Sequence, residues 1–241
     1  MDGILVINKP KGISSFHYLK KIQRKLSLKK VGHLGTLDPN ASGVLVLLCG
    51  HATKLNQSLS GGTKVYQSVF RFGIETDTLD PEGTIVATSK KIPTRGQILD
   101  KMKTLVGNTE IEVPKFSAVH INGRRAYDLA RAGIEFDAPK KNVDVLRFEM
   151  IDLDKTLCDI TEHGIDNAME VKEMGVVKDN LFAFEIECET GTYIRSLAKL
   201  LAEKLGTVAI AQEICRTAVG DFKIADAKTV ETVTLFDLKQ V

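Results

Sequence analysis

Apolar and polar positions follow the period of strands in some parts of the chain and of helices in others. Residues 4–7 form a short apolar run that predicts a strand, stopped by the polar turn at 9–12. Ser14 or Ser15 can then cap a helix, because the apolar residues that follow lie on one stripe at helical spacing: Phe16, Leu19, Ile22 and Leu26. Residues 44–48 are all apolar, which predicts the central strand of a sheet.

The same patterns continue to the end of the chain. Residues 66–72 and 84–88 predict two strands joined through a turn at 80–83, and Thr94 with Gln97 forms a capping box for a helix. Residues 182–188 alternate as a half-buried strand does, and an amphipathic helix follows Gly191 and ends at Gly206. Strands and helices mix without strict βαβ alternation. We therefore predict an α+β fold with a mixed, largely antiparallel sheet and flanking helices.

We expect one domain over residues 1–241, with one inserted excursion. Residues 110–140 are polar and broken by proline and glycine, so they predict a thumb-like segment that leaves the sheet. The 241 residues are 43% hydrophobic, which excludes a disordered chain, and 19 glycines exclude a collagen-like one.

Charge is distributed unevenly behind a net charge of +2. Residues 1–37 hold eight basic side chains against one acid, whereas residues 149–189 hold twelve acids against three lysines. This asymmetry favours one face that binds a polyanion and another that is only solvated. A lysine-rich helix that simply faces solvent remains an open alternative for the basic stretch.

The sequence lacks the motifs that are typical of several classes of protein chemistry. Four cysteines without a C-x-x-C pair indicate buried thiols in a reducing cytoplasm, and the histidine spacing gives no zinc site. We therefore expect no metal. Phosphate-binding, dinucleotide-binding and hydrolase glycine motifs are missing, which argues against kinase-like, P-loop, Rossmann and hydrolase functions. No run is apolar enough to span a membrane, and the N-terminus does not resemble a signal peptide.

Asp38 is the candidate reactive group. It ends a glycine-rich loop over residues 32–39, beside Pro39 and just before the most apolar run. Loops held by a rigid sheet often carry reactive groups, although an aspartate before proline commonly only caps a turn. The loop holds no second carboxylate, so the paired acids of glycosidases are not visible. A single carboxylate suits a nucleophile or base and needs a cation to stay ionised when partly buried.

These residues resemble the TruB family of tRNA pseudouridine synthases. The central block, residues 32–45, is similar to the family's G-H-x-G-x-L-D-P-x-A-[TS]-G motif. Four further blocks agree in order: Asn8-Lys9-Pro10-Lys11-Gly12 with Ser15; Lys64-Val65-Tyr66 with Gly73, Thr76, Asp77, Thr78 and Asp80; Pro114, Ser117, Ala118, Gly123, Tyr127, Ala130 and Arg131; and Gly191-Thr192-Tyr193-Ile194-Arg195-Ser196-Leu197, followed by Arg216 and Gly220. Together the blocks span about residues 4–222.

The resemblance implies a cofactor-free isomerase with the pseudouridine synthase fold. Its substrate would be uridine 55 in the T-arm stem-loop of tRNA, flipped out of its stack. Asp38 falls on the catalytic aspartate, which attacks C1′ of the ribose or C6 of the base. Arg195 falls on its arginine partner and Tyr66 on the active-site tyrosine. The resemblance also implies substrate binding by His33, Tyr66, Tyr193, Ile214 and Lys9. From the basic stretches and the motif ending, we expect RNA backbone contacts by Lys20, Lys21, Arg124, Arg125, Arg131 and Arg216.

The chain departs from the family pattern in a few places. Asn8, Val113, His120 and Cys215 replace the usual aspartate, proline, lysine and arginine. Residues 159–180 match nothing in the family, and their acidity argues against RNA contact. We also expect the C-terminal PUA-like domain of many members to be absent or truncated here. The expected protein is a cytoplasmic monomer that binds tRNA and no membrane.

Two other functions stay open from the sequence. An RNA-binding or RNA-folding protein on the same scaffold would lack turnover, and would require a disabled Asp38–Arg195 pair. A glycosidase or nucleosidase could use Asp38 as nucleophile, and would require an acid partner for the leaving group.

Overall fold

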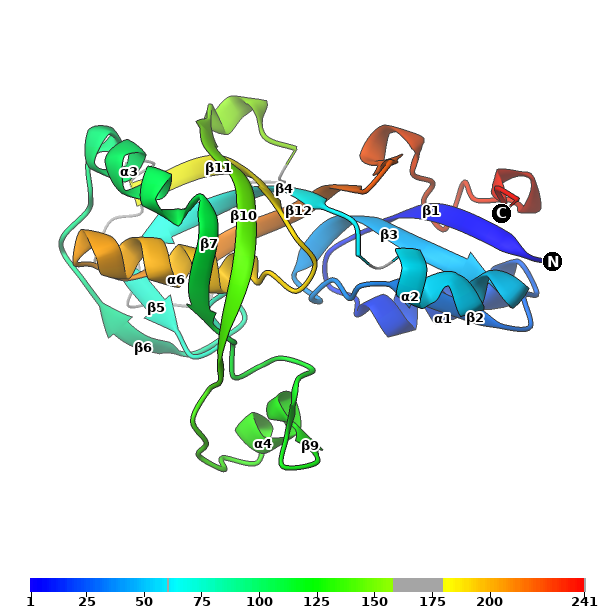
Figure 1. Ribbon diagram of the computed structural model, residues 1–241, viewed down its shortest axis with the longest axis horizontal. Helices are drawn as coiled ribbons and strands as arrows, with labels where there is room; N and C mark the ends of the chain where they lie inside the picture. The colour runs from blue at the N-terminus through cyan, green and yellow to red at the C-terminus, as the bar shows by residue number, and fades with distance from the viewer. Residues whose placement is uncertain (60, 158–179, 241) are drawn as a thin grey trace.

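A curved sheet of nine strands forms the centre of the molecule (Figure 1). The computed structural model describes residues 1–59, 61–157 and 180–240. The strand order is β1 (Gly3–Lys9), β3 (Ala41–Cys49), β12 (Ala209–Val219), β4 (Lys64–Phe72), β11 (Leu181–Cys188), β10 (Lys140–Ile151) and β7 (Gly107–Glu112), with β2 (Val31–Leu34) beside β3 and β13 (Phe222–Lys223) beside β12. Every pairing in this sheet is antiparallel except that of β3 with β12. The predicted α+β class is confirmed.

Shorter elements flank the sheet. Two hairpins pair β5 (Ile74–Thr76) with β6 (Ile85–Thr88) and β8 (His120–Ile121) with β9 (Arg124–Arg125). The helices are α1 (Ser15–Lys25), α2 (Asn56–Leu59), α3 (Arg95–Met102), α4 (Ala126–Arg131) and α6 (Ile194–Leu205). The strand predicted at 84–88 pairs with β5 and not with β4, because the turn at 80–83 closes a separate hairpin.

β3 is the central strand that its apolar run predicts. Leu45 and Leu47 pack into the larger core with α1 and α6, whereas Val44 and Val46 pack into a second cluster on the other face. Since both faces of β3 are covered, the run shows no period-two alternation of polar residues. The loop before β3 is therefore anchored to the most rigid part of the sheet.

α1 begins where the serine caps predict, with one difference in its buried face. The Ser14 side chain accepts a hydrogen bond from the His17 backbone, so Ser14 is the N-cap. Phe16, predicted to lie in the apolar stripe, is 58% exposed, and Tyr18 is buried in its place. The buried stripe is rotated because the Tyr18 hydroxyl accepts a hydrogen bond from Val230 of the C-terminal segment.

α3 and α6 also end as their sequences indicate. Both bonds of the Thr94–Gln97 capping box are present at the start of α3. Gly206 closes α6 with φ of 68°, the left-handed conformation that glycine adopts most easily. Together α3 and α6 cover the left half of the sheet (Figure 1).

The excursion leaves the sheet between β7 and β10, as the polar segment at 110–140 predicts. It carries α4 and the β8–β9 hairpin, and it projects below the sheet in Figure 1. The Val113 backbone donates to Pro139, which closes the two ends of the excursion at the sheet edge.

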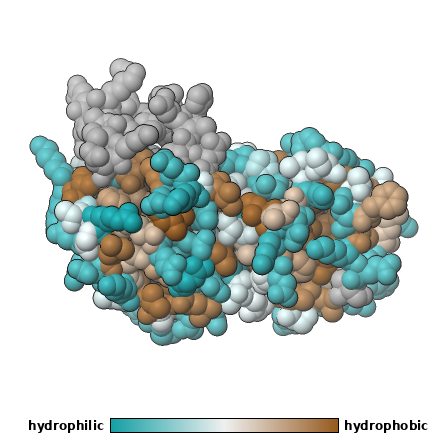
Figure 2. Space-filling model, turned by 90° about the horizontal axis from the view of Figure 1, so that it is seen from above, coloured by the Kyte–Doolittle hydropathy of each residue, from teal (hydrophilic) through white to brown (hydrophobic). Residues whose placement is uncertain are grey.

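Seen from above, polar side chains interleave with smaller apolar patches (Figure 2). Three described cysteines, Cys49, Cys188 and Cys215, are buried and free. Within the described ranges, no helix is both long and apolar enough to cross a membrane. The acidic stretch assigned to 159–180 lies, up to residue 179, outside the described residues.

Candidate active site

The loop between β2 and β3 presents Asp38. Leu37 points into the core and is 3% exposed, which fixes the backbone next to Asp38. Ser15, in the first turn of α1, has its hydroxyl bonded to both the backbone N–H and the carbonyl of Leu37, each at 2.8 Å. The Asp38 side chain itself is 37% exposed. α1 and the core therefore hold the loop while the carboxylate stays accessible.

Two residues expected to contact RNA or substrate bind this loop. Arg216 on β12 is 1% exposed, and its guanidinium donates to the carbonyls of Val44, Thr36 and Gly35. Arg216 also lines the cavity described below, so its expected RNA backbone contact stays a prediction. The guanidinium is buried because three carbonyls of the loop and β3 need donors there.

Lys9 also binds backbone carbonyls near Asp38. Its side chain is fully buried, and the ammonium donates to the carbonyls of Pro10, Ile13 and Pro39 at 2.8, 2.8 and 3.3 Å. Burial lowers the pKa of Lys9 to about 8. Lys9 thus ties the turn at 9–12 to the residue after Asp38, and its expected contact with the substrate stays a prediction.

Arg195 lies against Asp38. Its Nε is 2.9 Å from Oδ2 of Asp38, while its side chain is only 4% exposed. Nη1 donates to Thr78 and Nη2 to Phe116, both through backbone carbonyls. The Nε–H makes no aligned hydrogen bond, so the contact with Asp38 is an ion pair. A buried guanidinium held by two carbonyls supplies the cation that an ionised, partly buried carboxylate needs.

Asp80 completes this charge cluster and is a residue that the sequence interpretation left without a role. Its Oδ2 lies 3.9 Å from Nη1 of Arg195, and its Oδ1 accepts from the Thr78 hydroxyl and the Glu82 backbone. Burial raises the pKa of Asp80, against the lowering effect of those hydrogen bonds and of Arg195. Arg195 therefore sits between two carboxylates. The sequence signal for Asp80 was its place close to Thr78 in the motif block that begins at Lys64.

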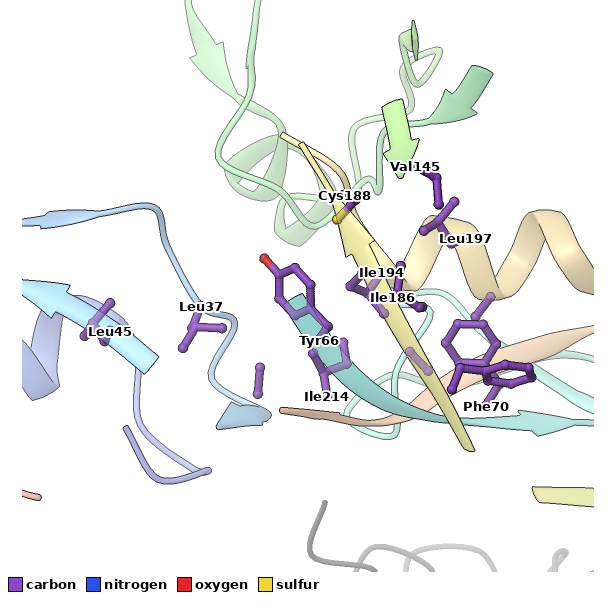
Figure 3. Close-up of a cluster of buried hydrophobic side chains, with 14 of the residues drawn as sticks. Leu37, Leu45, Tyr66, Phe70, Val145, Ile186, Cys188, Ile194, Leu197 and Ile214 are labelled. Atoms are coloured by element: carbon purple, nitrogen blue, oxygen red, sulfur yellow. The ribbon is translucent and has the colours of Figure 1, made fainter. Parts of the chain in front are cut away.

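A cavity of about 250 Å³ opens next to Asp38. Tyr66, Tyr193 and Ile214 line it, together with Asp38 and Arg195. In Figure 3 the Tyr66 ring stands on β4 near Ile214, and its hydroxyl points away from the sheet. Drug-sized ligands occupy roughly 300 Å³ or more, so this cavity suits a single planar base. Stacking rings and an apolar floor are what an unstacked pyrimidine needs.

The two tyrosines keep their protons. Burial raises the pKa of Tyr66, and it also raises the pKa of Tyr193. Neutral phenols can donate hydrogen bonds to a bound base, and they place no second negative charge beside Asp38.

The remaining predicted residues lie around the cavity and not in it. His33 belongs to β2 and not to a loop, and burial lowers its pKa, so the imidazole is neutral. It does not line the cavity. Lys20 and Lys21 lie on α1, half-exposed and exposed. Arg124, Arg125 and Arg131 of the excursion are all exposed, as is Lys115. Arg125 and Arg131 both stack on the Tyr127 ring.

Lys64 is the second residue that the sequence interpretation did not assign. It lines the cavity and is 7% exposed, and its ammonium donates to the Thr190 hydroxyl at 3.0 Å. Burial lowers its pKa to about 8. Its position before Tyr66 in β4 was the signal, because side chains at i and i+2 of a strand share a face.

Within the described ranges, no group of three or more histidine, cysteine, aspartate or glutamate side chains is arranged so that it could hold a metal ion.

The chain is similar to known proteins over nearly its whole length. Residues 23–194 match the model of the TruB family pseudouridylate synthase N-terminal domain. A protein of Geobacillus thermodenitrificans named tRNA pseudouridine synthase B is 39% identical over 235 residues, which cover 97% of this chain and 72% of that protein. A Borreliella burgdorferi protein of the same name is 38% identical over 233 residues, covering 97% and 75%.

A solved structure shares the fold. A chain of a Cbf5-Nop10-Gar1 complex superposes with a TM-score of 0.67 at 24% identity, covering 95% of this chain and 52% of that chain. This chain therefore spans about half the length of that structural neighbour, and the likeness supports the fold alone.

Proposed function

The chain belongs to the TruB family of pseudouridylate synthases, and from that premise we propose that it converts uridine 55 in the T arm of tRNA to pseudouridine. The observation that carries the proposal is the accessible Asp38 carboxylate paired with a buried Arg195 at the mouth of a base-sized cavity. Relatives named tRNA pseudouridine synthase B support tRNA as the substrate.

The isomerisation needs one nucleophile and no net change of atoms. The bond from N1 of the base to C1′ breaks and a bond from C5 to C1′ forms, while the proton on C5 is lost and N1 gains one. Asp38 would begin the reaction by attack on C1′ or on C6. Both routes need an anionic carboxylate, which Arg195 stabilises. Tyr66 and Tyr193 would stack on the extruded base and lower the cost of flipping it.

The experiment is release of tritium from tRNA labelled with 5-³H-uridine. Wild-type protein is expected to release tritium from the labelled transcript in buffer containing a chelator. A transcript with cytidine at position 55 is expected to release none. Release that depends on an added metal would contradict the mechanism, and equal release from both transcripts would contradict the assigned position.

Asp38→Asn tests the nucleophile. Its turnover is expected to fall by at least roughly 10³-fold, because the amide cannot form the covalent intermediate. Asp100→Asn, at an exposed position on α3, is the matched control and is expected to keep the wild-type rate. A tRNA-binding protein without catalysis would bind the transcript with both variants and release no tritium with either.

A further inference from the structure

The cavity contains more positive charge than the reaction at Asp38 uses. Its described lining has one carboxylate, Asp38, and three cationic side chains, namely Lys64, Arg195 and Arg216. Arg195 is paired with Asp38, and Arg216 is bound to backbone carbonyls. The charge of Lys64 has no carboxylate partner within 4.0 Å among the described residues. A buried ammonium without a counter-ion costs stability, so its retention calls for a function.

The Lys64 ammonium is placed at the wall of the cavity, between the Asp38 loop and the turn before α6. It donates to the Thr190 hydroxyl, and a methyl group built on Gly35 would lie 3.3 Å from Nζ. An ammonium has three N–H donors, and Thr190 uses one of them. Since Thr190 itself donates to the Gly62 carbonyl, this local network supplies a neutral acceptor only.

The neighbours of Lys64 add to the positive potential. Burial, Arg216 and Lys141 together lower its pKa to about 8, with the Cys188 thiol acting in the opposite direction. The Lys141 ammonium lies directly over Gly191, which also lines the cavity. Cations from β4, β10 and β12 therefore converge on one side of the site. An anion bound there would offset the repulsion between these cations.

We propose that Lys64 is an anion-binding residue for a phosphate that borders the flipped uridine. The inference rests on the proposed function, because that function places a nucleotide in the cavity. The base and the ribose are uncharged, so the phosphates on either side are the anions that a flipped nucleotide brings. Contact of Asp38 with C1′ or C6 holds the ribose at the cavity mouth, and the phosphate then enters with it. Lys64 thereby fixes the sugar relative to Asp38.

The test pairs a protein variant with neutral phosphates in the RNA. Three T-arm hairpins are compared: one unmodified, one with a single methylphosphonate on the 5′ side of the target uridine, and one with it on the 3′ side. Lys64→Met removes the charge and keeps a side chain of similar length. Lys103→Met, at an exposed position just after α3, is the matched control and is expected to behave as wild type.

Lys64→Met is expected to raise KM for the unmodified hairpin roughly 10- to 100-fold, which corresponds to one lost charge-assisted contact. One of the two methylphosphonates is expected to raise the KM of wild type by a similar factor. The same methylphosphonate is expected to leave the KM of Lys64→Met almost unchanged. The phosphate contact is wrong if neither methylphosphonate raises the KM of wild type. It is also wrong if a methylphosphonate raises the KM of Lys64→Met by the same factor as that of wild type.

Two further measurements separate this proposal from other failures. Lys64→Met is expected to unfold at the same or a higher temperature than wild type, since replacing a buried charge by an apolar side chain is often neutral or stabilising. A clearly lower unfolding temperature would make Lys64 a structural residue and overturn the proposal. Wild-type turnover on the unmodified hairpin tests the proposed function separately. If turnover is absent, the same comparison of hairpins by equilibrium binding still decides the role of Lys64.

Discussion

At the scale of single residues, the site depends on how Arg195 is held. The guanidinium faces two carboxylates at unequal distances, 2.9 Å to Asp38 and 3.9 Å to Asp80, and two backbone carbonyls fix its plane. Asp80 does not line the cavity, so it acts on the substrate only through Arg195 and is a positioning residue. Its negative charge offsets part of the burial cost of the guanidinium and leaves Asp38 accessible.

Asp80→Asn is expected to lower turnover about 10²-fold at neutral pH, since a small displacement of a catalytic pair has costs of that order. Burial raises the pKa of Asp80, so the wild-type enzyme protonates this carboxyl at a higher pH than an ordinary aspartate. Activity should therefore fall as the pH decreases through this raised pKa. The variant lacks that titration, and its remaining acid limb should lie at lower pH. Rates of tritium release across pH measure this. An unchanged acid limb would assign the titration to another group, such as Glu82, whose pKa is also raised by burial.

The limits of sequence reasoning are clearest at the residue scale. Sequence spacing and a family resemblance suggested the roles of Asp38 and Arg195, which lie far apart in the chain and meet in the structure. The roles of Lys9 and Arg216 do not follow from the sequence, because a basic residue in a motif can equally bind a substrate or a backbone carbonyl. Only the position of the carbonyls decides between those roles, and that position depends on loop conformation.

At the scale of elements, local patterns predicted strands, helices and caps well, and crossings between elements poorly. The caps of α3 and α6 depend on neighbouring residues alone. The pairing of β3 with β12 joins residues over 170 positions apart and is the single parallel contact in the described sheet. No local sequence pattern predicts this pairing, although the close approach of the two strands accounts for the glycine at position 43.

Gly43 tests that crossing. It lies opposite Arg216 with φ of 103°, and a Cβ there would collide with the Arg216 backbone. Gly43→Ala is expected to destabilise the fold by at least about 2 kcal/mol, which lowers the unfolding temperature by roughly 5 °C or more. Gly96→Ala is the control, because nothing lies within 4 Å of its Cβ position at the start of α3. Its unfolding temperature should stay the same or rise by a degree or two. Thermal unfolding of both variants decides, and equal behaviour would contradict the steric argument.

At the scale of the whole molecule, two elements that carry exposed cations are joined to the site. α1 is joined to the Asp38 loop through Ser15, and the excursion is joined to Arg195 through the Phe116 carbonyl. The exposed cations of α1 are therefore linked to the Asp38 side of the site, and those of the excursion to the Arg195 side. This arrangement fits a long polyanion that crosses the cavity, which the net charge of +2 does not reveal.

Lys20 and Lys21 on α1 provide the test of this arrangement. Reversal of both to glutamate is expected to weaken tRNA binding at least 10-fold at low salt, because phosphate contacts release counterions when they form. The dependence of log Kd on log salt should become shallower by about one unit for each phosphate contact that is lost. Lys101 at the end of α3 and Lys103 just after it are both exposed. Their reversal adds the same negative charge at the other end of the sheet and is expected to have a smaller effect with an unchanged salt slope. Equal losses in the two double variants would show that binding responds to total charge and not to where the charge lies, and this arrangement would then be wrong.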